Sequence, residues 1–160
     1  MKRTNESAPM GINKTVQAVF DKTMYLIDAQ SEGSGETVNS DSREYQVRTI
    51  GILNTLLDLV YPASDTFQIG EDGARPALPD ITSFEDELNL DARILREVLP
   101  NALAAKLLSE ENATLANYFQ QCFEQSLLDA KARRPASFES IEEAVPYGGI
   151  EHGQYGSWGF

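Results

Sequence analysis

A chain of 160 residues, 41% of them hydrophobic and 24% charged, has the size and composition of one globular domain with its own core. Its 25 acidic residues outnumber 13 Lys and Arg, and the net charge of -12 argues against sequence-independent binding to nucleic-acid phosphate. The single cysteine, Cys122, excludes an intrachain disulfide and a multi-cysteine metal site. No run approaches the roughly 20 apolar residues of a membrane span, and no apolar signal-peptide core follows the first basic residues. We therefore expect no association with a membrane, and synthesis in the cytoplasm.

The first predicted helix follows a polar N-terminal segment, residues 1–12, in which a proline and a glycine favour irregular structure. Asn13 is a candidate cap, and apolar residues then recur at intervals of three and four to about Ile27. These residues are Val16, Val19, Phe20 and Met24. The segment 30–39 is rich in glycine, acidic and hydroxyl residues, which predicts a flexible loop.

A second helix is predicted from near Asp41 to the residue before the stop signal at Pro62. Asp41 and Glu44 have the spacing of a capping box, although Ser40 or Ser42 is an alternative cap. One apolar stripe runs along this segment. It comprises Ile50, Leu53, Leu56, Leu57 and Val60, widened by Val47 and Ile52.

A long segment rich in proline and glycine, residues 62–82, separates the second helix from the third. Thr66–Ile69 and Leu78–Ile81 are short apolar stretches on either side of a turn signal, which predicts a minor β-hairpin. The acids at 85–87 then follow one another directly. Since consecutive carboxylates point in different directions, they favour a solvated surface over a cation site.

A third helix is predicted to begin at a cap, either Asn89 or Asp91, and to carry a wide apolar face. That face comprises Ile94, Leu95, Val98, Leu99, Ala102, Leu103, Leu107 and Leu108. Pro100 lies inside this pattern, where it removes a backbone donor, so we expect the helix to bend or divide near Leu99.

A fourth helix is predicted from Asn112, as its cap, to about Ala130. Its apolar positions are Leu115, Phe119, Cys122, Phe123 and Leu127, and we expect Cys122 to pack in the core as a small hydrophobe. The short connection before Asn112 makes the third and fourth helices antiparallel neighbours. The sequence therefore predicts an all-α domain, a small four-helix bundle with long loops, over residues 13–131.

The remaining residues, 132–160, alternate aromatic rings with glycine and predict an extended C-terminal arm. Either the rings fold back to complete the domain core, or they anchor on a neighbouring chain, since Tyr and Trp supply large contact areas. The candidates for partner contact are Tyr147, Gly148, Gly149, Ile150, Tyr155, Trp158 and Phe160.

Catalytic signals are weak throughout the chain. His152 is the only histidine, and it lies in the arm between Glu151 and Gly153 with no rigid element to aim it as a base. A phosphate-binding loop requires a helix to start directly after its glycines, and no helix start follows the glycines of segment 70–76. We therefore expect a protein that is not an enzyme, with no catalytic residue, cofactor or metal.

The segment Leu99–Phe119 has the pattern LP-x-x-LAA-x-LL-x-x-E-N-x-x-LA-x-x-F. This pattern resembles the head-to-tail connector (adaptor) proteins of tailed bacteriophages. The upstream segment Thr49–Phe67 and the closing YGGIEHGQYGSWGF are also similar to phage neck sequences. The resemblance covers roughly residues 41–160.

The resemblance implies a homo-oligomeric ring, typically a dodecamer, which docks beneath the portal protein in the virion neck and continues the DNA channel to a tail-side neck protein. It implies no catalytic residues. DNA is expected to pass without specific binding, because an acidic wall repels phosphate. The channel-facing candidates are Glu71, Asp72, Glu85, Asp86 and Glu87. Solubility alone explains the acidity equally well.

Two alternatives remain open from the sequence. One is a closely related neck role, as a stopper or tail-completion protein. The other is a helical protein-binding or regulatory module that belongs to no virion.

Overall fold

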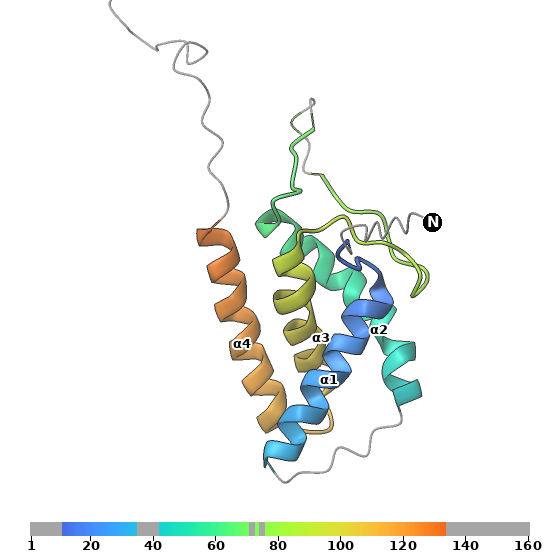
Figure 1. Ribbon diagram of the computed structural model, residues 1–160, viewed down its shortest axis with the longest axis vertical. Helices are drawn as coiled ribbons and strands as arrows, with labels where there is room; N and C mark the ends of the chain where they lie inside the picture. The colour runs from blue at the N-terminus through green and yellow to red at the C-terminus, as the bar shows by residue number, and fades with distance from the viewer. Residues whose placement is uncertain (1–10, 35–41, 71–72, 74–75, 134–160) are drawn as a thin grey trace, which may run out of the picture.

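The computed structural model describes residues 11–34, 42–70, 73 and 76–133 (Figure 1). Four α-helices make up most of this part, so the predicted all-α class is confirmed. The elements in chain order are α1 (Val16–Ser34), α2 (Ser42–Val60), the 3-10 turn η1 (Tyr61–Ala63), the π-helical segment η2 (Ile94–Val98), α3 (Leu99–Leu107) and α4 (Ala113–Ala132). None of the described helices is long and apolar enough to cross a membrane.

Helix α3 is the centre of the domain and packs against α1, α2 and α4, most extensively against α4. In Figure 1 it lies between α4 and the other two helices. Almost every residue of α3 is buried; only Asn101 and Lys106 retain more than slight exposure. A helix that is apolar on all sides must be covered on all sides, and its three alanines let the neighbouring helices approach closely.

The predicted division near Leu99 is present and takes the form of a π-helical turn. The backbone N–H of Leu99 donates to the carbonyl of Ile94, five residues earlier. Pro100 has no N–H to donate, and its ring would crowd the carbonyl of the preceding turn in a regular α-helix. The wider π turn accommodates the ring before the chain resumes as α3.

Capping side chains fix the start of the second half of the fold. Asp91, rather than Asn89, accepts hydrogen bonds from the backbone N–H groups of Arg93 (2.8 Å) and Ile94 (3.1 Å). Asn112 accepts from the N–H of Leu115 at 3.0 Å, which confirms it as the cap of α4.

The first helix starts and ends later than its pattern predicts. Thr15 is the cap, because its hydroxyl accepts from the N–H of Ala18, whereas Asn13 bonds only to Thr15. Helix α1 continues to Ser34, so the predicted loop 30–39 is wrong over its first half. The candidate caps Ser40 and Asp41 lie outside the described residues.

The long segment after α2 is irregular, and the predicted hairpin is wrong. No β-strand occurs in the part of the chain that the structure describes; there is one isolated bridge, between Thr15 and Glu87. The backbone of Ile81 instead bonds to the Asn54 side chain of α2, donating at 2.7 Å and accepting at 3.0 Å. The Asn54 side chain thus provides the hydrogen bonds that a facing strand of a hairpin would provide.

The same segment closes the N-terminal end of α1. The N–H groups of Val16 and Gln17, which have no partner within the helix, donate to the carbonyls of Asp86 (3.0 Å) and Phe84 (2.9 Å). The N–H of Leu88 donates in turn to the carbonyl of Lys14 at 2.9 Å. We call residues 76–90, which include Glu85, Asp86 and Glu87, the acidic loop. Its backbone hydrogen bonds anchor it to the start of α1.

Two predicted core positions are wrong. Val47 is 79% exposed, and the buried side chain of this turn of α2 is Tyr45, whose hydroxyl donates to Glu111 at 2.7 Å. Cys122 is only half-buried, because it lies at the edge of the buried face of α4.

Candidate functional site

The outward side of α4 carries a stripe of uncharged side chains. Thr114, Tyr118, Gln121, Gln125 and Leu128 follow one another at alternating steps of four and three, which places them on one helix face. All five are exposed, including the large apolar side chains of Tyr118 (43%) and Leu128 (62%). We call this surface the α4 stripe.

Charged residues of α4 lie beside the stripe rather than on it. By helical position, Glu124 and Lys131 fall along one border and Asp129 along the other, near the C-terminal end. In a chain of net charge -12, most surfaces repel a second copy of the same chain. A face without charges over several turns is where such repulsion is weakest, and depletion of charge is typical of interface cores.

One residue of the α4 stripe, Tyr118, has a shifted pKa. The pKa of Tyr118 is raised above its ordinary value, first by a hydrogen bond with Cys122, next by the charge of that thiol group, and last by partial burial. The two residues are one helical turn apart.

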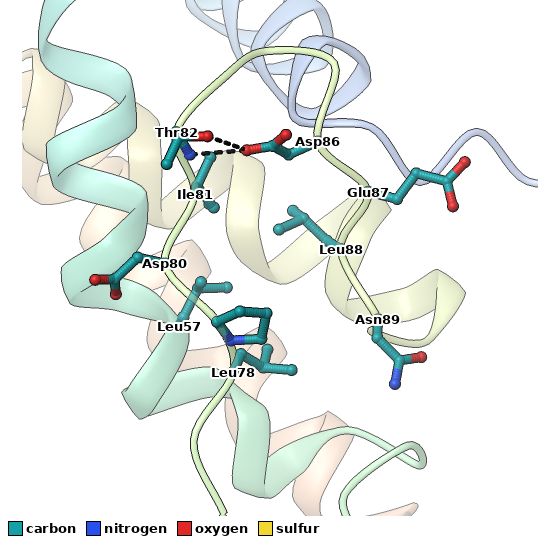
Figure 2. Close-up of a pocket in the computed structure, with 10 residues that line it drawn as sticks. Leu57, Leu78, Asp80, Ile81, Thr82, Asp86, Glu87, Leu88 and Asn89 are labelled. Carbon is teal, nitrogen blue, oxygen red and sulfur yellow. Dashed lines mark hydrogen bonds between the residues drawn. The ribbon is translucent and has the colours of Figure 1, made fainter.

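A second surface is a groove formed between α2 and the acidic loop, with a volume of about 350 Å³ (Figure 2). Leu57 of α2 and Leu78, Ile81 and Leu88 of the loop supply its apolar lining. The pairing of Asn54 with Ile81 holds this part of the loop against α2. We call it the loop groove.

The charged side chains along the loop groove, Asp80, Asp86 and Glu87, are all acidic. Asp86 accepts from the backbone N–H of Thr82 (2.7 Å) and of Ser83 (2.9 Å) and from the Thr82 hydroxyl (3.1 Å). The two backbone donors, Thr82 first, hold the pKa of Asp86 below its usual value. Figure 2 shows Asp86 turned toward Thr82, while Glu87 points away from it. None of the described residues that line this groove is Lys or Arg, so it disfavours an anionic ligand.

The candidate channel residues differ in their surroundings. Glu85 and Glu87 are exposed, whereas Asp86 is half-buried and engaged within its own turn. Glu71 and Asp72 lie outside the described residues. A channel exists only in an assembly of copies, so the channel-facing role of these acids stays a prediction.

The partner-contact candidates of the arm, Tyr147 to Phe160, also lie outside the described residues. Within the described ranges, no three His, Cys, Asp or Glu side chains converge on a point that could hold a metal ion. The surfaces that the structure offers are therefore the α4 stripe and grooves between elements.

Sequence reasoning missed the α4 stripe because it followed only the apolar positions of this helix. The signal was present, however, as a second repeat with the same spacing, built mainly from uncharged polar residues. No protein-family model matches the chain, and no curated protein or solved structure matches it.

Proposed function

We propose that the protein is a head-to-tail connector (adaptor) subunit of a tailed bacteriophage. Copies would assemble into a dodecameric ring beneath the portal protein in the virion neck and continue the DNA channel toward a tail-side neck protein. The observation that carries the proposal is the α4 stripe, because it offers an uncharged helical surface to a second copy of a strongly acidic chain. This helix belongs to the segment that resembles connector proteins.

The packing of α4 supports its use as a contact surface. Its inner side chains, among them Phe119 and Phe123, are buried against the rest of the domain, and α3 is its main partner. A surface on a helix that is held along its length keeps its geometry better than a surface on a loop. Ring closure requires such a constant geometry at each contact.

The acidic loop supports the channel half of the proposal. Its backbone is tied to α1 and α2, while Glu85 and Glu87 remain exposed. If the loop lines the lumen, these carboxylates repel DNA phosphate and allow sliding without specific binding. In this proposal Glu71, Asp72 and Asp86 contribute to the same negative field.

The arm completes the proposal as the segment that joins the subunit to its neighbours. Its rings would dock on the portal or on an adjacent copy, since aromatic side chains give large contact areas at low entropy cost. Neither catalysis nor a cofactor nor a metal is part of the proposed role.

The experiment is assembly of the purified chain with the portal protein, followed by measurement of particle mass. A variant carrying both Tyr118→Glu and Leu128→Glu places charges on the α4 stripe; it should remain folded by circular dichroism and monomeric by mass. The matched control is Val47→Glu, since Val47 is also exposed and apolar but lies on α2. We expect the control to form rings; rings formed equally well by the stripe variant would overturn the proposal.

The α4 stripe also suits a second candidate, a helical binding module outside any virion, because an uncharged face accepts a helix from another protein equally well. A stopper or tail-completion protein is a third form of the neck role. A ring that forms only when the portal is present would favour the connector over the binding module. Its position relative to the portal, seen by electron microscopy, separates a connector from a stopper.

A further inference from the structure

A third surface differs from the others in its charge. It is a groove of about 350 Å³ between the N-terminal half of α1 and the η2 segment. Val19 and Leu95 contribute to its apolar lining, and Ile12, 38% exposed, forms its rim. This volume is at the lower end of the roughly 300–1,000 Å³ typical of ligand pockets, which suits a single aromatic side chain. We call it the basic groove.

Two cations line the basic groove, Lys22 of α1 and Arg96 of η2, and none of its described lining residues is acidic. Neither cation makes an ion pair with another described residue. The ammonium of Lys22 lies 5.2 Å from the centre of the Tyr25 ring, which holds it at the surface by a cation–π contact. In a chain of net charge -12, a groove with only positive charges is a site for carboxylate groups.

The arm has the complementary chemistry. Residues 135–160 contain no Lys or Arg, and Glu151 stands between the aromatic residues Tyr147 and Tyr155. Glu151 and Trp158 stand in one short stretch of sequence, with Gly153 and Gly156 between them.

We propose that the basic groove receives the arm of a neighbouring copy. The Trp158 ring packs on the apolar lining near Ile12 and Leu95, and the Glu151 carboxylate binds beside Lys22 and Arg96. This inference rests on the proposed function in one respect, namely that copies of the chain lie next to one another. The basic groove would then be a second surface, besides the α4 stripe, through which adjacent copies in a ring contact each other.

The test uses two full-length variants that can bind each other in only one direction. The acceptor-dead variant carries Lys22→Glu and Arg96→Glu, both at exposed positions where charge reversal leaves the fold intact. The arm-dead variant carries Glu151→Lys and Trp158→Ala. Since Trp158 is the only tryptophan in the chain, the emission of a mixture comes from the acceptor-dead variant alone.

We expect the tryptophan emission to shift to shorter wavelength, and to saturate, as the arm-dead variant is added to the acceptor-dead variant. The control is an arm-dead chain that also carries Lys22→Glu and Arg96→Glu, which should cause no shift. An absent shift, or the same shift with the control, would overturn the inference, including the case in which the arm binds only the portal. A wild-type chain that remains monomeric by sedimentation, at concentrations where the mixture shows the full shift, would show that the arm binds its own groove and would also overturn it. Because no portal is present, this result is independent of whether portal-dependent rings form.

Discussion

The two faces of α4 both recur at helical spacing but differ in burial and in side-chain chemistry. The inner face, Leu115, Phe119, Phe123 and Leu127, is buried, and the outer face is the exposed α4 stripe. The inner residues are large and apolar, whereas the outer ones are mostly uncharged and polar, with Tyr118 and Leu128 as exceptions. The inner face therefore belongs to the core of the domain, and the outer face is the surface that we propose for assembly.

Depletion of charge, rather than hydrophobicity alone, distinguishes the outer face of α4 from other exposed surfaces of the domain. Single apolar residues also lie exposed elsewhere, such as Val47 and Ile69. Isolated exposed apolar residues are common in folded proteins and carry little information. An exposed helix face whose charged residues lie only along its borders, in an acidic chain, is more informative.

The largest expected effect comes from truncating the inner face. Phe119→Ala should lower the free energy of unfolding by about 3–5 kcal/mol, because it removes a ring that is only 2% exposed and leaves a cavity. Its sequence neighbour provides the matched control: Tyr118→Ala should cost below about 1 kcal/mol. Denaturant titration measures both, and similar losses would show that the two faces do not differ as described.

A smaller effect is expected at the cap that sets where both faces begin. Asn112→Ala removes the acceptor of the Leu115 N–H and should cost about 1 kcal/mol of unfolding free energy. Thr114→Ala, two residues after the cap and exposed, should change stability by no more than about 0.5 kcal/mol. If the cap variant is as stable as the wild type, the start of α4 is fixed by packing alone.

The smallest expected effect concerns the acidic loop, where half-buried Asp86 and exposed Glu87 provide a similar contrast. Because the pKa of Asp86 is lowered in the folded state, its carboxylate stabilises the fold above the ordinary carboxyl pKa, and this contribution is lost as the pH falls through the lowered value. The stability difference between wild type and Asp86→Asn should therefore shrink in acid. Glu87→Gln, at an exposed position, is the control and should show no such change; thermal unfolding across pH measures both.

The helical part of the fold was predictable because its signals are local. The caps Asp91 and Asn112 bond to N–H groups two or three residues away, and Pro100 acts on its own turn. In α2, however, the buried row runs from Leu53 back through Thr49 to Tyr45 in steps of four. Apolar periodicity missed it because Thr49 is polar; the helix buries Thr49 by letting its hydroxyl donate to the Tyr45 carbonyl at 2.6 Å.

The loop and the surfaces were harder to predict because their partners are distant in sequence. Thr66–Ile69 and Leu78–Ile81 have the composition of a hairpin, yet the Ile81 backbone pairs with Asn54 of α2. The basic groove likewise joins Lys22 to Arg96, which only the packing of α1 against η2 brings together. A sequence pattern contains no information on such pairs until the helices are placed.

The most direct test of the central claim, that the α4 stripe joins adjacent copies, is a cryo-electron microscopy map of the chain assembled with its portal. We expect a ring in which Tyr118 and Leu128 of each copy lie at the contact with the next copy. A ring in which the α4 stripe faces solvent around the circumference would contradict it.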